Sequence, residues 1–218
     1  MRKYLAELLG TFMLVFLGTG TVVIAKGDTL AIGLSFGLAI TIMAYSVGGI
    51  SGGQFNPAVT IAMMINGRTK VQDGIFYIIT QFIGATLASA VLAIFINALG
   101  LPTDGFGQTD FPEISAGIAV LVEVIITFLF ILVILMVTSK KYGNSQMAPL
   151  AIGLVLSFLI IVALNLTGGS LNPARSFGPA IFAGGSALSH YWVYIVGPVV
   201  GGILAALCGK FMGSEEEA

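Results

Sequence analysis

The tripeptide Asn-Pro-Ala occurs twice in this chain, and each copy lies inside an otherwise apolar run just after a glycine-rich stretch. The six residues are Asn56, Pro57, Ala58, Asn172, Pro173 and Ala174. Glycine and an Asn-Pro pair interrupt helices. In a bilayer, interrupted backbone is tolerated only where protein or a water-filled cavity satisfies its N–H and C=O groups. Two interruptions at matching places therefore predict a shared polar site inside a membrane.

The composition supports a membrane location. Of 218 residues, 57% are hydrophobic and only 9% are charged, whereas soluble domains carry about 25% charged residues. The sequence contains no basic patch, so no nucleic acid is expected as a partner. We interpret the whole chain as one domain in the lipid bilayer, and we expect its short acidic tail, 213–218, to be disordered.

Six apolar segments are long enough to cross the bilayer as helices, which takes about 20 residues. They are 4–25, 29–48, 74–99, 115–138, 147–166 and 188–211. Two shorter segments, 56–66 and 172–182, begin at the tripeptides. Asn at the N-cap and Pro at the first helical position favour a helix start. The sequence therefore predicts an all-α membrane fold with six transmembrane helices and two re-entrant half-helices.

The basic residues predict the orientation. Seven of the nine lie on one side of the six predicted spans. These seven are Arg2, Lys3, Arg68, Lys70, Lys140, Lys141 and Lys210. Because loops rich in Lys and Arg stay in the cytoplasm, both termini are predicted to be cytoplasmic.

The chain is an internal repeat of two halves, about 1–100 and 115–212, which align at a spacing of 116 to 120 residues. Glu7 matches Glu123, and the two tripeptides match each other. Each half has three spans, so the second half must enter the bilayer from the opposite side, as an inverted repeat. The half-helices then enter from opposite faces, and their N-termini meet near the midplane.

The meeting point is predicted to be a narrow pore. Each helix N-terminus carries about half a positive charge, and Asn56 and Asn172 offer N–H donors at the same place. The glycine-rich segments offer a row of backbone carbonyls as acceptors. The glycines concerned are Gly52, Gly53, Gly168 and Gly169. Positive helix ends in a pore repel cations and protons.

Arg175 breaks the repeat, because its counterpart in the first half is Val59. Charged residues inside a membrane are usually functional. Arg175 is therefore predicted to line the extracellular side of the pore and repel cations. The alternative is that it only binds loop carbonyls, and the two roles are compatible.

Glu7 and Glu123 are the only acids within the predicted spans. One interpretation is proton coupling. The other is a scaffold role, in which each carboxylate accepts hydrogen bonds from N–H groups of a half-helix or its preceding loop. We favour the scaffold, because both acids occupy the same repeat position.

The two tripeptides in an inverted repeat, with Arg175 directly after the second, resemble the aquaporins, the major intrinsic protein family, along essentially the whole chain. The resemblance implies the six-helix, two-half-helix fold, a homotetramer with one pore per subunit, and passive flow of water or small neutral solutes without a cofactor. It also places the family's aromatic/arginine filter at four positions. These are Phe36, Ile160, Gly169 and Arg175.

The filter positions give a mixed pattern. Phe36 and Arg175 match the water-channel pattern, but strict water channels usually carry His at the position of Ile160, whereas some archaeal members carry Ile. Ile160 makes the wall apolar and Gly169 removes bulk, so a wider and less polar filter is predicted.

Other positions resemble the water channels. Glycerol facilitators usually have Asp and Lys where this chain has Ser176 and Ala180. Tyr194 also fits the water class, while Ile195 departs from its usual Trp.

These patterns predict a passive channel in the plasma membrane for water and small neutral solutes such as glycerol, excluding protons and ions. One alternative is a glycerol or small-solute facilitator with water secondary. Another is an ion-coupled secondary transporter, which also uses inverted repeats and broken helices but needs ionisable residues near its site. No enzyme activity is expected, because no nucleophile is paired with a base and no His/Cys cluster occurs.

His190 is the only histidine. We interpret it as an exposed loop residue rather than a pH sensor, and its neighbours Tyr191 and Trp192 as interfacial anchors.

Overall fold

The computed structural model describes residues 1–102 and 105–214, and within them every regular element is a helix. Six of the helices are long and apolar enough to cross a membrane. They are α1 (Arg2–Val23), α2 (Thr29–Ser51), α4 (Val71–Ala98), α5 (Ala116–Val137), α6 (Ala148–Thr167) and α9 (Val193–Phe211). The remaining ones are short: α3 (Pro57–Ile65), α7 (Pro173–Ala183) and α8 (Gly185–Ser189).

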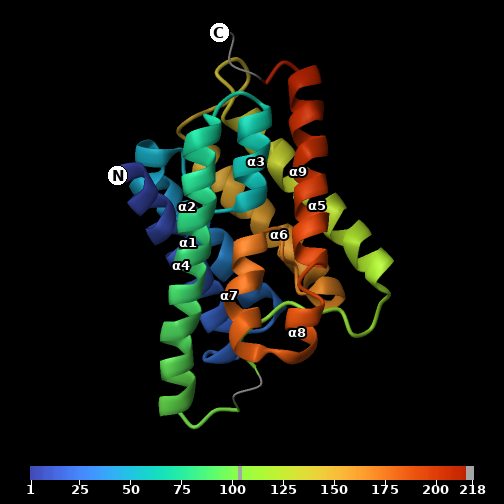
Figure 1. The fold of residues 1–218 in the computed structure, drawn as a ribbon. Helices are drawn as coiled ribbons and strands as arrows, with labels where there is room; N and C mark the ends of the chain where they lie inside the picture. The colour runs from blue at the N-terminus through green and yellow to red at the C-terminus, as the bar shows by residue number, and fades with distance from the viewer. Residues whose placement is uncertain (103–104, 215–218) are drawn as a thin grey trace.

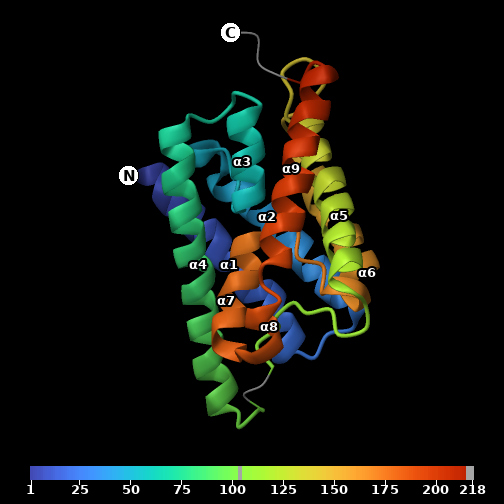
Figure 2. The same cartoon turned by 45° about the vertical axis from the view of Figure 1, so that its right-hand side comes forward.

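The long helices stand side by side and surround the two half-helices α3 and α7, which lie at different heights in the bundle (Figures 1 and 2). Helix α1 packs on α4 and α5 packs on α9, while each half-helix also packs on the last long helix of the other half, α3 on α9 and α7 on α4. These contacts between opposite halves join the two halves of the sequence in one bundle.

Helices α2 and α6 pack closely against each other, and two glycines bring their backbones together. A Cβ added to Gly37 would lie 2.2 Å from the carbonyl oxygen of Gly153, and one added to Gly153 would lie 2.5 Å from that of Gly37. The contact is reciprocal, and the two residues are 116 positions apart, as the repeat requires. Small residues of this kind allow close helix packing in membranes.

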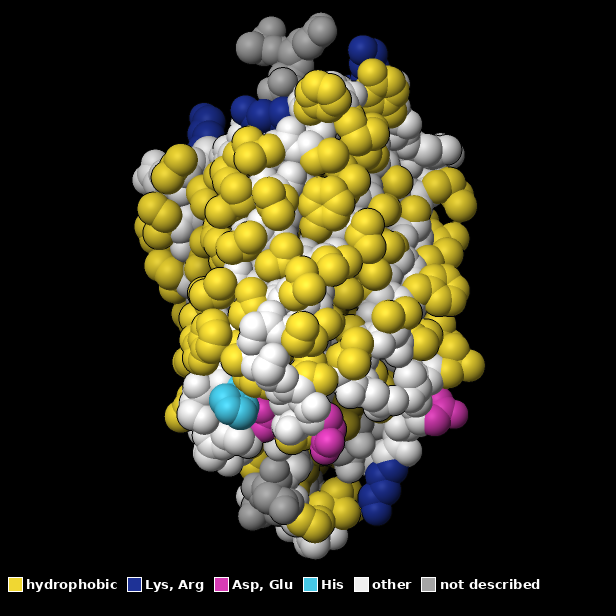
Figure 3. Space-filling view, turned by 90° about the vertical axis from the view of Figure 1, so that its right-hand side faces the viewer, with side chains coloured by type: hydrophobic (Ala, Val, Ile, Leu, Met, Phe, Trp, Pro, Cys, Tyr) yellow, Lys and Arg dark blue, Asp and Glu magenta, His cyan; other side chains and the backbone are white. Residues whose placement is uncertain are grey.

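The outside of the bundle is apolar. Phe158 and Val162 on α6, for example, are 62% and 68% exposed. Figure 3 shows hydrophobic side chains over the middle of one face and charged side chains toward its two ends. Such a belt is the surface expected of helices that face lipid.

The predicted spans agree with the helices to within three residues at each end, except for the sixth. The segment 188–211 is divided into α8 and α9 by a turn at 190–192. In this turn the N–H of Tyr191 donates to Leu188 and that of Val193 to His190, so the helical i to i+4 pattern is interrupted. The aromatic residues of the turn kept the sequence apolar and concealed the break.

The expected tail, 213–218, lies mostly outside the described residues. Residues 215–218 lie outside the described residues, but Ser214 is buried. Its N–H donates to the carbonyl of Gly209, and its carbonyl accepts a hydrogen bond from Arg68. The expectation of disorder is therefore wrong for Ser214.

Candidate functional site

Both half-helices begin at the asparagines, as the sequence predicts. Asn56 is the N-cap of α3, and its side-chain oxygen accepts a hydrogen bond from the N–H of Ala58 at 2.9 Å. Asn172 caps α7 in the same way, accepting from Ala174 at 3.0 Å and from Arg175 at 3.2 Å. A proline follows each asparagine at the first helical position, where its missing N–H costs nothing.

The same two asparagines connect the halves of the chain. The Asn56 amide nitrogen donates to the carbonyl of Leu171 at 2.8 Å, and that of Asn172 donates to the carbonyl of Phe55 at 2.9 Å. A carboxamide has two N–H groups, so each asparagine retains one further donor. Both side chains line a narrow cavity in the middle of the molecule.

The loops that lead into the half-helices have matching backbone conformations. Positive φ angles occur at Gly52, Gly53 and Phe55 in one loop and, 116 positions later, at three residues of the other. These three are Gly168, Gly169 and Leu171. Phe55 and Leu171 have φ of 50° and 55°, a region that non-glycine residues seldom adopt. Other parts of the structure must therefore hold these loops in place.

Glu7 and Glu123 hydrogen-bond to these loops. Both carboxylates are fully buried, and each accepts the N–H groups of the two residues before an asparagine and a hydroxyl from the end of the preceding long helix. The donors to Glu7 are Ser51, Gln54, Phe55 and Gln81, at 2.6 to 2.9 Å. The donors to Glu123 are Thr167, Ser170 and Leu171, at 2.7 to 3.0 Å.

The narrow cavity is a constriction. The space in it that is open to the centre of a water molecule is about 10 Å³, which is close to the minimum for one water. Phe36, Ile160 and Arg175, three of the four predicted filter residues, line it with the two asparagines. Gly169, the fourth, packs against Ile160, where an added Cβ would lie 3.2 Å from the Ile160 Cα.

Arg175 is 3% exposed, and its guanidinium carbon lies 4.6 Å from the centre of the Phe36 ring, in cation–π contact. Its Nη1 donates to the carbonyl of Gly107 at 3.2 Å. Gly107 belongs to the loop before α5, and the sequence did not identify it, because a backbone carbonyl contact leaves no residue pattern.

A wider cavity of about 400 Å³ lies on the other side of the asparagines. Gly52, Gly53 and Val59 line it, and Ile40 lines both cavities. The path therefore leads from a wide vestibule, past the asparagines, to the constriction. Val59 faces the vestibule at the repeat position where Arg175 faces the constriction.

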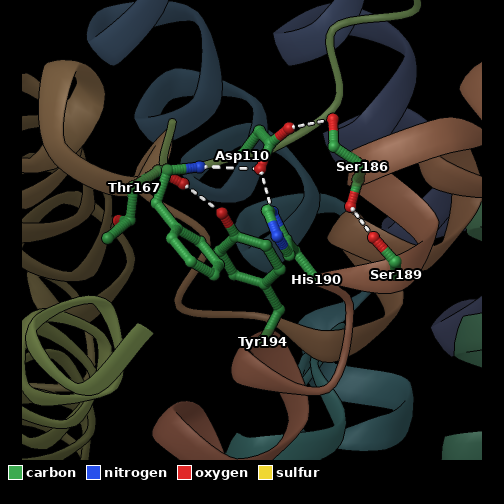
Figure 4. Close-up of polar contacts among 7 residues, drawn as sticks. Asp110, Thr167, Ser186, Ser189, His190 and Tyr194 are labelled. Atoms are coloured by element: carbon green, nitrogen blue, oxygen red, sulfur yellow. Dashed lines mark hydrogen bonds and ion pairs between the residues drawn. The ribbon is translucent and has the colours of Figure 1, made fainter. Parts of the chain in front are cut away.

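Two residues that the sequence related to solute class lie behind the pore wall. Ser176 hydrogen-bonds to Thr109 at 2.8 Å and lies 2.6 Å from the hydroxyl of Ser170. The Tyr194 hydroxyl donates to the carbonyl of Thr167 at 2.9 Å (Figure 4). Both therefore support the loop before α7.

His190 lies in the turn before α9, but it is partly buried and paired rather than freely exposed. Its Nδ1 lies 2.7 Å from Asp110, its side chain is 37% exposed, and its ring stacks on Phe111 at 4.4 Å. Burial alone raises the pKa of Asp110, but hydrogen bonds from His190, Ser186 and the Phe111 N–H outweigh burial and hold this pKa below the ordinary aspartate value. The pairing joins residues 80 positions apart, which the sequence alone could not indicate.

The described part of the chain contains no group of three or more His, Cys, Asp or Glu residues arranged to hold a metal ion. The polar groups of the pore are instead amide, hydroxyl and guanidinium donors. This arrangement can orient and bind a neutral polar molecule.

The family model described as Major intrinsic protein matches residues 1–208. Glycerol uptake facilitator protein-like 6 of Lactiplantibacillus plantarum is 69% identical over 216 residues, which cover 99% of this chain and 100% of that protein. Aquaporin Z of Photorhabdus laumondii is 41% identical and matches along the full length of both chains. Among solved structures, the aquaglyceroporin from Plasmodium falciparum is similar with a TM-score of 0.85 and 26% identity, over 94% of this chain and 93% of that one.

Proposed function

Because this chain belongs to the major intrinsic protein family, we propose that it is a passive channel for water and small neutral solutes such as glycerol, and that it excludes ions and protons. One observation carries the proposal. Two half-helix N-termini meet beside a cavity with room for about one water, and each presents an asparagine that is bonded to the other half of the chain.

The asparagines orient the permeating molecule. Each helix N-terminus carries about half a positive charge, and each asparagine has one N–H left to donate. A water molecule between them turns its oxygen toward these donors and its hydrogens away. The same positive ends repel cations and protons.

Arg175 adds a full positive charge at the constriction. It is the one ionisable side chain among the residues that line the narrow cavity. A cation entering there loses hydration and meets no negative partner in the wall. We assign the aromatic/arginine filter to Phe36, Ile160, Gly169 and Arg175.

The loops supply the remaining polar surface. We assign the carbonyls of Gly52, Gly53, Gly168 and Gly169 to the lining of the path, and a scaffold role to Glu7 and Glu123. The hydrogen bonds of both acids to loop N–H groups favour the scaffold over proton coupling. Neither acid lines the narrow cavity, as an ion-coupled transporter would require.

Water and glycerol are both proposed as solutes, with water the faster. The constriction admits about one water at a time, and Ser176 and Ala180 differ from the usual glycerol facilitators. A channel in which glycerol is the main solute is the second candidate. It is favoured by the apolar Ile160 in the wall and by the 69% identity to a relative named as a glycerol uptake facilitator-like protein.

We also propose that the protein lies in the plasma membrane as a homotetramer, with both termini in the cytoplasm. Seven of the nine basic residues are found at the ends of the spans that this orientation places in the cytoplasm. The apolar outer surface is compatible with either lipid or neighbouring subunits.

The test is stopped-flow light scattering on proteoliposomes, with water and glycerol permeability measured on one preparation. We expect water flow well above that of empty liposomes and slower, but clearly raised, glycerol flow. Glycerol flow with water at background would favour the second candidate. Neither flow above background, from correctly folded protein, would contradict the proposal.

A further inference from the structure

Asp110, Ser186 and His190 form a small polar cluster (Figure 4). Asp110 is at its centre. One carboxylate oxygen lies 2.7 Å from His190 Nδ1 and accepts the Phe111 N–H at 2.8 Å, and the other accepts from the Ser186 hydroxyl at 2.5 Å. The cluster thus joins the loop before α5 to α8 and to the turn before α9.

The same loop also contacts the constriction. Three residues before Asp110, the Gly107 carbonyl accepts a hydrogen bond from Arg175. One residue before it, the Thr109 hydroxyl donates to Ser176, which follows Arg175 on α7. Gly107 also packs against Thr19, where an added Cβ would lie 3.0 Å away. Only two residues separate Gly107 from Asp110, so a shift of the backbone at Asp110 reaches the oxygen that holds Arg175.

We propose that Asp110 and His190 are positioning residues for Arg175, and that they set the passage of glycerol relative to water through the constriction. The inference rests on the proposed channel function. While Gly107 holds the guanidinium beside Phe36, the constriction stays at its widest. Without that restraint Arg175 also takes positions that intrude into the path, and the larger solute is obstructed before water is.

The charge of Asp110 makes the cluster strong. Although partial burial acts in the opposite direction, hydrogen bonds from His190, Ser186 and the Phe111 N–H hold the pKa of Asp110 below the ordinary aspartate value, so its carboxylate is ionised near neutral pH. Hydrogen bonds to an ionised acceptor are about twice as strong as neutral ones. Removing this charge therefore loosens the loop.

The experiment measures the glycerol-to-water permeability ratio of proteoliposomes at neutral pH, with the same pH on both sides. Asp110→Asn removes the charge and keeps the shape, and we expect the ratio to fall about threefold, within the range of mutations that act through packed contacts. Glu113→Gln is the matched control, because it removes a charge from an exposed acid of the same loop. We expect it to behave like the unmodified protein.

His190→Gln and His190→Ala separate positioning from a general loss of structure. Glutamine still offers an N–H to Asp110, so His190→Gln should keep the ratio of the unmodified protein, whereas His190→Ala removes the donor and should lower the ratio as Asp110→Asn does. If Asp110→Asn matches Glu113→Gln, or if His190→Gln and His190→Ala give the same ratio, the inference is overturned and the proposed channel function stands. If the unmodified protein conducts neither solute, the proposed function itself fails.

Discussion

Arg175 and Val59 hold the same position in the two halves of the repeat, yet one is charged and the other is apolar. Arg175 lines the constriction beside Phe36, and Val59 lines the wide vestibule. The two halves therefore have matching backbones but form an asymmetric pore. The Arg175 and Val59 pair accounts for much of the difference between its two sides.

Replacing Arg175 by valine, as in Arg175→Val, copies the residue of the first half. Removing the guanidinium opens space beside Phe36 and removes the charge that repels cations. We expect glycerol permeability to rise about fivefold, the effect of lowering the barrier by about 1 kcal/mol, and ion exclusion to weaken. Stopped-flow glycerol uptake and a proton-flux dye assay on the same liposomes measure both effects, with Val59→Ile in the wide vestibule as control. Unchanged glycerol flow would remove Arg175 from the filter.

At the scale of single residues, the sequence predicts a site residue where the residue type itself carries the chemistry. The repeated tripeptides located the two half-helix starts, and the break in the repeat singled out Arg175. The contacts of Arg175 with Gly107 and of His190 with Asp110 were not predictable. One uses a backbone carbonyl and the other joins residues 80 positions apart, and neither leaves a local pattern.

The elements that need the most support are the two loops before the half-helices. Each has positive φ at a non-glycine residue, which costs about 1 kcal/mol or more. Each is fixed by a buried carboxylate on the first long helix of its half, Glu7 on α1 and Glu123 on α5. The half-helices are then held by long helices of the opposite half, so the pore is built between elements distant in sequence.

Glu123→Gln tests the scaffold role. Thr167, Ser170 and Leu171 all donate to Glu123, so an amide NH₂ placed there faces another donor and leaves at least one hydrogen bond unmade. We expect a loss of about 1–3 kcal/mol in stability, seen as a lower Tm in detergent, while the channels that remain folded conduct water at the original rate.

The control is again Glu113→Gln, an exposed acid whose replacement should leave the Tm unchanged. Solute accumulation driven by a pH gradient, present in the unmodified protein and lost in Glu123→Gln without a change in Tm, would show coupling and refute the scaffold.

Five of the six long helices were predictable to within three residues, because apolar length alone defines a span. The sixth was not, since the turn before α9 is made of aromatic residues that read as part of the apolar run. The burial and bonding of Ser214 were missed for a related reason: a polar residue near the end of a chain gives no sign that Arg68 will bind its carbonyl.

At the scale of the whole molecule, the two halves also meet between α2 and α6, where Gly37 and Gly153 are in reciprocal contact. An odd number of spans in each half puts the second half upside down with respect to the first. Both termini then lie on one side, together with most of the basic residues. The inverted repeat was readable from the sequence, because residue patterns 116 positions apart recur with three spans between them.

Orientation is testable by labelling in intact cells. In a Cys208→Ser background, which removes the only native thiol, we expect a membrane-impermeant maleimide to label Glu113→Cys and not Lys141→Cys. Both positions are exposed and they lie at opposite ends of α5. Permeabilised cells control for reactivity, since both thiols should then react. The reverse pattern in intact cells would invert the proposed topology.

The central claim is that solutes cross where the two asparagines meet, and its most direct test is the water permeability of Asn172→Leu beside Asn97→Leu. Asn97 is an exposed asparagine near the end of α4, so its replacement controls for the chemical change. In protein that stays monodisperse and helical, we expect Asn172→Leu to bring water flow down to that of empty liposomes and Asn97→Leu to leave it intact. Folded Asn172→Leu protein that conducts water at the original rate would contradict the account.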